Sequence, residues 1–200
     1  MTAASAPGVS GSGVSGSGVL GSAVPRPAFS VRRAVATDVE RLADVHIQCW
    51  QETYRGMLSD AFLAAADREG RLVLWRHLLD RPDPAEAWVA CDGDTVVGFA
   101  GIRSVPAPES PEGDPLPESG PLELWGLYLL ASHQGLGLGG QLLGTALGTQ
   151  AASLWVAAGN SRAIGFYRRF GFEPDGAEDT LADWEDLPEI RMVRPVQPAA

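Results

Sequence analysis

The sequence predicts a single α/β domain in which helices flank both faces of a mixed central β-sheet. With 200 residues, the chain is long enough for one domain that buries most of its apolar surface without disulfides. Its apolar residues follow strand and helix periodicities in the order strand, two helices, two strands, strand, helix, strand, helix and two strands. The early strand pair is joined by a short turn and should be antiparallel, whereas later strands alternate with helices, so a mixed sheet is expected.

The folded domain is expected to span residues 29–195, with a tail at each end. Gly, Ser, Ala and Val dominate residues 1–28, and Arg26 is the only charged side chain there. This Gly/Ser/Ala-rich segment cannot assemble a packed core and is expected to be disordered. Glycine and serine interrupt each of its short apolar runs, which argues against an export signal. Residues 196–200 are expected to form a short C-terminal tail.

The first part of the domain is predicted to be a strand followed by two helices. Residues 29–33 have the composition of a short strand. Thr37, with Glu40 three residues later, forms a capping box that predicts the start of a helix, and apolar residues then recur at helical spacing. Ser59 or Asp60 is expected to cap a second helix.

The middle of the domain contains a predicted hairpin and a proline-rich loop. Residues 87–91 and 95–102 are strand-like and flank the turn sequence Asp-Gly-Asp at 92–94, which predicts an antiparallel pair. Six prolines, mixed with acidic residues and glycine, exclude regular structure for most of residues 104–121. We expect this segment to be a surface loop.

The last part of the domain alternates strands and helices. Asn160 is a favourable helix N-cap, and Gly171 suits the left-handed residue that ends a helix. A helix is expected to begin in the glycine run at 135–140. The other predicted elements are strands at 122–130 and 153–158, a helix at 161–170, and closing strands at 172–174 and 189–193.

Charge and cysteine content exclude several classes of function. The formal net charge of −10 argues against a nucleic-acid-binding protein, because phosphate affinity needs clustered Lys and Arg. No apolar run approaches the roughly 20 residues needed to span a bilayer, so no membrane association is expected. Cys49 and Cys91 are far apart, and no Cys and His cluster has metal-ligand spacing. We therefore expect no metal, and reduced thiols in the cytoplasm.

The most informative segment is the loop at residues 134–140, with the sequence QGLGLGG. Glycines between a strand and a helix let main-chain N–H groups approach a ligand, and the helix dipole favours negative charge. A phosphate-bearing cofactor is therefore expected there. The loop also satisfies the dinucleotide fingerprint G-x-G-x-x-G. However, the next strand lacks the acidic residue that would bind the ribose, which disfavours a nicotinamide or flavin oxidoreductase.

Two motifs in this region resemble those of the GNAT N-acetyltransferase superfamily. The first is ELWGLYL at residues 123–129 followed by the loop. In it Gln134, Gly137 and Gly139 match the family pattern of Gln or Arg, two residues, Gly, one residue, then Gly or Ala. The second motif, at residues 154–172, follows at the spacing found in the family. Looser similarity upstream extends the resemblance over most of the predicted domain.

The resemblance implies that acetyl-CoA is the cosubstrate and indicates which residues bind it. Main-chain groups of Leu127, Tyr128 and Leu129 would bind the pantetheine arm as an added strand would. Asn160 would contact the same arm in addition to capping its helix. Main-chain N–H groups of the loop would hold the pyrophosphate. The loop residues assigned to the cofactor are Gln134, Gly135, Leu136, Gly137, Leu138, Gly139 and Gly140.

The resemblance also implies catalytic and acceptor-binding roles. Tyr167 stands in the place of the tyrosine that contacts the cofactor and donates a proton to the departing CoA thiolate; packing against the cofactor alone is the alternative. Glu123 matches the general-base glutamate of histone-acetylating members, and a solvated glutamate at a strand end is an equal alternative. Trp50 and Tyr54 correspond to the region that borders the amine acceptor, although aromatic residues at helical spacing also suit a core.

The expected function is transfer of an acetyl group from acetyl-CoA to a primary amine of a small molecule or a protein. A regulatory module that binds acetyl-CoA without transferring the acetyl group is the alternative. Transfer of a longer acyl group stays open, because pocket size cannot be read from the sequence. Dimerisation is common among relatives, so a homodimer is compatible with the resemblance, but no feature of the chain specifies one.

Overall fold

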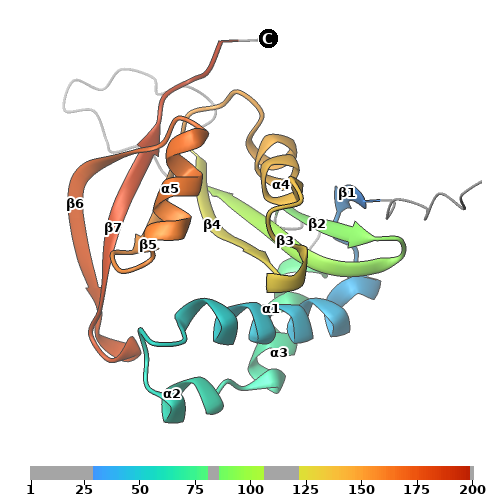
Figure 1. Cartoon of the computed structure of the whole chain (residues 1–200). Helices are drawn as coiled ribbons and strands as arrows, with labels where there is room; N and C mark the ends of the chain where they lie inside the picture. The colour runs from blue at the N-terminus through green and yellow to red at the C-terminus, as the bar shows by residue number, and fades with distance from the viewer. Residues whose placement is uncertain (1–28, 81–85, 106–121, 199–200) are drawn as a thin grey trace, which may run out of the picture.

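The computed structural model describes residues 29–80, 86–105 and 122–198 (Figure 1). The expected tail at 1–28, most of the expected loop at 104–121 and the last two residues lie outside these ranges. The strands are β1 (Phe29–Arg33), β2 (Glu86–Asp92), β3 (Thr95–Ser104), β4 (Leu122–Leu129), β5 (Ala152–Ala157), β6 (Glu173–Leu181) and β7 (Leu187–Arg194). The helices are α1 (Val39–Tyr54), α2 (Asp60–Ala64), α3 (Arg68–Leu79), α4 (Leu138–Leu147) and α5 (Ser161–Arg169).

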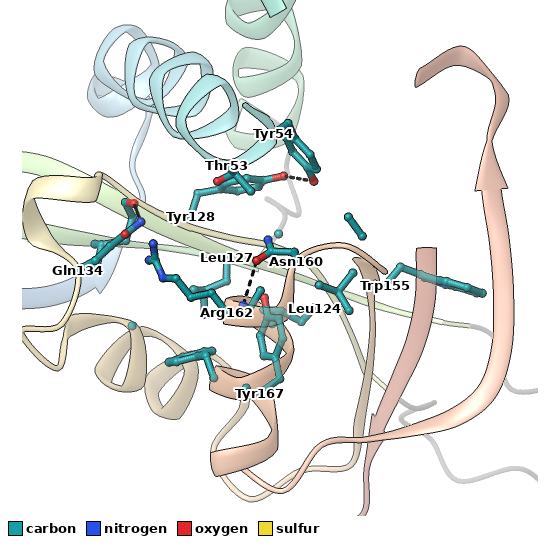
Figure 2. A pocket seen from close by; sticks show the side chains of 18 of the residues that line it. Thr53, Tyr54, Leu124, Leu127, Tyr128, Gln134, Trp155, Asn160, Arg162 and Tyr167 are labelled. Atoms are coloured by element: carbon teal, nitrogen blue, oxygen red, sulfur yellow. Dashed lines mark hydrogen bonds between the residues drawn. The ribbon is translucent and has the colours of Figure 1, made fainter. Parts of the chain in front are cut away.

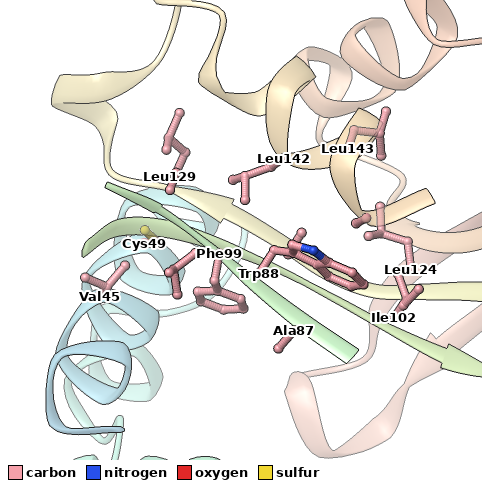
Figure 3. Close-up of a cluster of buried hydrophobic side chains, with 14 of the residues drawn as sticks. Val45, Cys49, Ala87, Trp88, Phe99, Ile102, Leu124, Leu129, Leu142 and Leu143 are labelled. Atoms are coloured by element: carbon pink, nitrogen blue, oxygen red, sulfur yellow. The ribbon is translucent and has the colours of Figure 1, made fainter. Parts of the chain in front are cut away.

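The strands form one mixed sheet in the order β1-β2-β3-β4-β5-β7-β6. The helices α1 and α3 lie on one face of this sheet, and α4 and α5 lie on the other (Figure 1). Figure 3 shows Val45 and Cys49 of α1 meeting Phe99 of β3, while Leu142 and Leu143 of α4 approach the strands from the opposite side. The predicted fold class is therefore confirmed. In the described part of the chain, no helix has the length and apolar character required to cross a membrane.

The start of α1 differs from the prediction. A turn of 3-10 helix precedes α1, and the Asp38 carboxylate accepts hydrogen bonds from the Val35 N–H at 2.9 Å and from Arg32 at 2.7 and 2.8 Å. The predicted capping box of Thr37 and Glu40 is wrong. Asp38 supplies the carboxylate at this end, and Glu40 instead bonds an arginine of α3.

The predicted second helix is in fact two helices, each with its own cap. The Ser59 hydroxyl accepts from the Phe62 N–H at 3.1 Å at the start of α2. At the start of α3, the Asp67 carboxylate accepts from the N–H groups of Glu69 and Gly70, at 3.0 and 2.9 Å. Because Asp67 satisfies the N–H groups that open α3, the chain starts a new helix there instead of continuing α2.

The parallel strands β4 and β5 separate soon after they begin. Only the first two residues of each strand pair with each other, ending at Glu123 and Ser153. On its other side β4 pairs with β3 as far as Leu129. Trp125 is an extra residue of β4 without a partner on β3, and it precedes the residue that pairs with Gly101. Such a bulge bends a strand. An open wedge therefore lies between β4 and β5 beyond the paired residues.

The closing hairpin is larger than predicted. The strand β6 continues to Leu181, well beyond the expected range 172–174, and β7 covers slightly more than 189–193. As an edge strand, β6 leaves most of its polar residues exposed. Its ladder to β7 is interrupted between Pro174 and Glu178, around Gly176, whose φ is +91°. This irregular, polar composition explains why apolar alternation did not reveal the strand.

Candidate active site

A cleft of about 1250 Å³ follows the wedge between β4 and β5. Its walls come from the end of α1, the strands β4 and β5, the glycine loop, α5 and the hairpin of β6 and β7 (Figure 2). Pockets for single small molecules usually measure roughly 300–1,000 Å³. The cleft is therefore large enough for an extended ligand and part of a second one.

One wall of the cleft is an unpaired strand edge. Beyond Glu123, β4 has no ladder partner among the described residues on the side that faces β5. Leu127, Tyr128 and Leu129 all line the cleft there. Main-chain N–H and C=O groups along such an edge can pair with an extended ligand that carries amide groups. A pantetheine arm has that chemistry, so the residues fit it.

The glycine loop forms the end of the cleft beside α4. Gly135 and Gly137 have φ of +77° and +87°, a left-handed backbone that favours glycine, and both line the cleft. Gly137 is the N-cap of α4, so the first N–H groups of this helix lack helical acceptors and can bind an anion. The Gln134 side chain donates to the Leu129 carbonyl oxygen at 2.7 Å, which ties the loop to the end of β4.

Two further glycines of the loop serve helix packing. A Cβ at Gly140 would lie 2.8 Å from Cζ of Phe170, and a Cβ at Gly139 would lie 3.2 Å from Cε2 of Phe166. Both phenylalanines belong to α5 or follow it directly. These glycines therefore allow α5 to pack closely against the first turn of α4.

The two leucines of the loop do not line the cleft with their side chains. Leu138 is fully buried in the core, and the Leu136 side chain is 52% exposed to solvent. Any role of either residue in binding a ligand would therefore depend on its main-chain N–H group.

Tyr167 and Asn160 reach the cleft from α5. Tyr167 is 8% exposed, and its hydroxyl makes no hydrogen bond to another described residue. Figure 2 shows this hydroxyl pointing from α5 toward the gap between β4 and β5. Burial, and secondarily the charge of Tyr54, raise the pKa of Tyr167, so its phenol stays protonated at neutral pH. Asn160 is the predicted N-cap, because its Oδ1 accepts from the Ala163 N–H at 3.0 Å.

A tyrosine pair stands across the wedge from Tyr167. The hydroxyls of Tyr54 and Tyr128 are 3.3 Å apart (Figure 2). Burial raises the pKa of Tyr54, and the charge of nearby Glu189 raises it further, against the opposing effect of the hydrogen bond to Tyr128. Of the two predicted acceptor residues, Tyr54 lines the cleft. Trp50 lies behind it, 4% exposed, with its ring 5.8 Å from that of Tyr54.

Glu123 also lines the cleft, but an arginine engages its carboxylate. Arg103 Nη2 lies 2.6 Å from Glu123 Oε1, and the Glu123 side chain is 15% exposed. The residue belongs to the part of β4 that is still paired with β5, through Ser153. It therefore lies at the closed end of the wedge.

The charged residues of the cleft come from several elements of the fold. Arg162 and Arg169 come from α5, and Figure 2 shows Arg162 extending toward the side where Gln134 lies. Asp179 and Glu189 come from the hairpin of β6 and β7. The arginines of α5 suit phosphates, and the two carboxylates of the hairpin suit a cation. Glu52 of α1 also lines the cleft, but its carboxylate accepts from the Ala131 N–H at 2.8 Å.

Several cleft residues were missed by sequence reasoning. Most of them belong to the closing hairpin, where no local pattern singled them out, and Trp155 lies in the second motif without an assigned role. Among them are Glu52, Arg103, Trp155, Asp179, Leu181, Trp184 and Glu189. Within the described ranges, no three His, Cys, Asp or Glu side chains are grouped so that they could hold a metal ion.

Comparison with known proteins agrees with this geometry. The model of the acetyltransferase (GNAT) family matches residues 43–172. The chain is 26% identical over 172 residues to the probable N-acetyltransferase Rv2775 of Mycobacterium tuberculosis. That match covers 81% of this chain and 88% of the relative.

Solved structures share the fold at low sequence identity. The PaiA N-acetyltransferase of Thermoplasma acidophilum, solved in complex with coenzyme A, superposes with a TM-score of 0.61 at 22% identity, over 84% of this chain and 98% of its own. The ribosomal-protein-S18-alanine N-acetyltransferase of Escherichia coli superposes with a TM-score of 0.55 at 18% identity, over 86% and 96%.

Proposed function

Because the chain belongs to the acetyltransferase (GNAT) family, we propose that it transfers the acetyl group of acetyl-CoA to a primary amine of a small molecule or a protein. The observation that supports this most directly is the wedge between β4 and β5. A strand edge and a phenol, both without a partner in the described part of the chain, face the same cleft as a helix N-terminus there.

The cofactor-binding part of the proposal rests mainly on main-chain groups. Leu127, Tyr128 and Leu129 pair with the pantetheine arm along the free edge of β4, and Asn160 contacts it from the start of α5. The N–H groups of residues 135–140 hold the pyrophosphate at the N-terminus of α4. Arg162 supplies a cation on the same side of the cleft.

The chemistry requires a neutral amine, a polarised carbonyl and a proton for the leaving thiolate. Acetyl-CoA, as substrate, supplies the thioester carbonyl and the thiolate. Tyr167 donates the proton to that thiolate, since its raised pKa keeps the phenol protonated. Main-chain N–H groups near Leu129 polarise the carbonyl. Tyr54 lines the acceptor end of the cleft, and Trp50 supports it from behind.

A module that binds acetyl-CoA without transfer is the competing function. It gives no reason for a buried phenol with no bond to another described residue at the wedge. The test is release of free CoA thiol from acetyl-CoA across a panel of diamines, amino acids, aminoglycosides and short peptides, with a no-acceptor control. Acceptor-dependent release supports transfer, whereas tight acetyl-CoA binding with no release for any acceptor supports the binding module.

A further inference from the structure

The hairpin of β6 and β7 contributes two carboxylates to the cleft, and they face each other. Asp179 of β6 and Glu189 of β7 are direct partners in the ladder, and both line the cleft. Neither forms an ion pair with a described residue, and Arg191 of β7 pairs instead with Asp175 at 2.7 Å. Like charges at directly opposed positions destabilise a sheet. A cationic ligand between them would remove that cost.

Glu189 lies beside the tyrosine pair. Its ladder partner on β5 is Ala157, and Leu187, two residues earlier on the same face of β7, packs in one cluster with Tyr54 and Ala157. The effect of its charge on the Tyr54 phenol agrees with this proximity. Glu189 is half-buried, and burial, followed by the charge of Asp179, raises the pKa of its carboxyl group.

Glu123, the other candidate base, is placed differently. Its ladder partner Ser153 is four residues from Ala157 along β5, which corresponds to about 13 Å in a strand. Its carboxylate is also engaged by Arg103. The open part of the wedge, to which Tyr54 and Tyr128 both contribute, is therefore on the side of Glu189.

We propose that Glu189 is the general base that receives the acceptor amine in its ammonium form, with Asp179 opposite it attracting the cation. This inference rests on the proposed acetyl transfer. The Glu189 carboxylate takes one proton from R–NH₃⁺, leaving R–NH₂ and a protonated carboxyl group that later releases its proton to solvent. The nitrogen forms the C–N bond as the C–S bond breaks. Tyr167 gives its proton to the thiolate and regains one from the nitrogen, so one hydrogen stays on the amide.

The groups around Glu189 also define the class of acceptor. The groups that face Glu189 are Asp179 from β6, Tyr54 from α1 and, along β7, the already paired Arg191, while β5 contributes the uncharged Ala157. Among the described residues beside Glu189, no unpaired basic side chain could bind an anionic group of the acceptor. The acceptor is therefore an amine without a carboxylate next to it.

A binding experiment tests the site without relying on turnover. The probes are 1,5-diaminopentane and lysine, which differ only by one carboxylate, titrated calorimetrically into the CoA-saturated protein. Wild type should bind the diamine at least about tenfold more tightly than lysine, a difference of roughly 1.4 kcal/mol. Glu189→Gln should lose this affinity. Equal affinity of the diamine for wild type and Glu189→Gln, or no measurable binding to wild type, would overturn the proposal.

The matched control is Glu178→Gln. Glu178 precedes Asp179 on β6, is exposed and does not line the large cleft. The control should bind the diamine and acetyl-CoA as wild type does. Thermal unfolding of both variants checks that each is folded.

A kinetic experiment then assigns the base. Because the pKa of Glu189 is raised in the folded protein, the activity of wild type should fall as pH falls through a value above the pKa of an ordinary glutamate. Glu189→Gln should lower kcat by about 10² to 10⁴ and abolish this acidic limb, with acetyl-CoA affinity unchanged. If Glu123→Gln removes the limb and Glu189→Gln behaves as the control does, Glu123 is the base. A wild type that releases no CoA thiol with any amine contradicts the proposed function instead.

Discussion

At the scale of single residues, Tyr167 is the side chain whose removal should separate chemistry from binding. Its phenol lies at the wedge, buried and without a bond to another described residue. Tyr167→Phe keeps the packing but removes the proton donor, so kcat should fall by about 10² to 10⁴. Calorimetry should show nearly unchanged acetyl-CoA affinity. An unchanged kcat under conditions in which chemistry limits the rate would remove Tyr167 from the acid role.

The buried His46 leads to a prediction about the stability of the protein at acidic pH. His46 is 7% exposed, its ring lies between Trp75, Phe99 and Tyr128, and its Nδ1 has no hydrogen-bond partner among the described residues. Burial first, then the charge of Arg71, lowers its pKa from 6.5 to about 3. The unfolded chain therefore binds this proton more readily between these values, and stability falls as pH decreases below 6.5.

The size of that effect can be measured by comparing wild type with His46→Leu. At 1.36 kcal/mol per pKa unit, His46 should account for about 2 kcal/mol of lost unfolding free energy between pH 7 and pH 5. Chemical denaturation at both pH values should show that the unfolding free energy of the variant changes less with pH than that of wild type. Equal slopes for the two proteins would show that His46 is not held neutral.

The residues of the cofactor end could be proposed from sequence because they lie in continuous motifs. Asn160 as a favourable N-cap predicted the observed cap, and the glycine run predicted the start of α4 close to Leu138. The two carboxylates of the hairpin could not be predicted. Asp179 and Glu189 are brought together by the register of β6 with β7, which no local pattern specifies.

At the scale of elements, the contact between α4 and α5 explains part of the glycine loop. Gly140→Ala should destabilise the protein by about 1–3 kcal/mol, because its Cβ would meet the Phe170 ring. Gly144→Ala, in the same helix with no atom near its Cβ, should instead stabilise by roughly 0.5–1 kcal/mol. Urea denaturation of both variants checks this. Similar effects of the two substitutions would contradict the assigned packing role.

The hairpin of β6 and β7 is held in place by a distant partner. Glu185 accepts from the Ser59 N–H at 2.8 Å and from its hydroxyl at 2.5 Å, so the hairpin tip meets the start of α2. Glu185 and Asp186 both have positive φ, of 53° and 56°, although neither is glycine. Backbone of this kind persists where surrounding contacts fix it. A contact between residues so far apart in the chain explains why the sequence did not reveal this wall of the cleft.

At the scale of the whole molecule, the net charge and the carboxylates of the cleft both favour a cationic acceptor. The chain carries a formal net charge of −10, and two of its carboxylates, without a described cationic partner, lie at the acceptor end of the cleft. An anionic field attracts a cationic acceptor over a distance that salt screens. For a diamine acceptor, kcat/KM should therefore fall as ionic strength rises from about 0.01 to 0.15 M, where the screening length shortens from roughly 30 to 8 Å. The thiol-release assay in a salt series measures this, and an unchanged kcat/KM would contradict electrostatic attraction.

The proposed reaction is acetyl transfer to an amine within the wedge between β4 and β5. Its most direct test is mass spectrometry of an amine panel after incubation with acetyl-CoA that carries an isotope-labelled acetyl group, using wild type and Tyr167→Phe. We predict labelled acetyl on the nitrogen of at least one amine with wild type, and a loss of about 10² or more in its rate with the variant. Labelled product formed equally fast by both proteins would contradict the role of Tyr167, and no labelled amine, despite measured acetyl-CoA binding, would contradict the transfer itself.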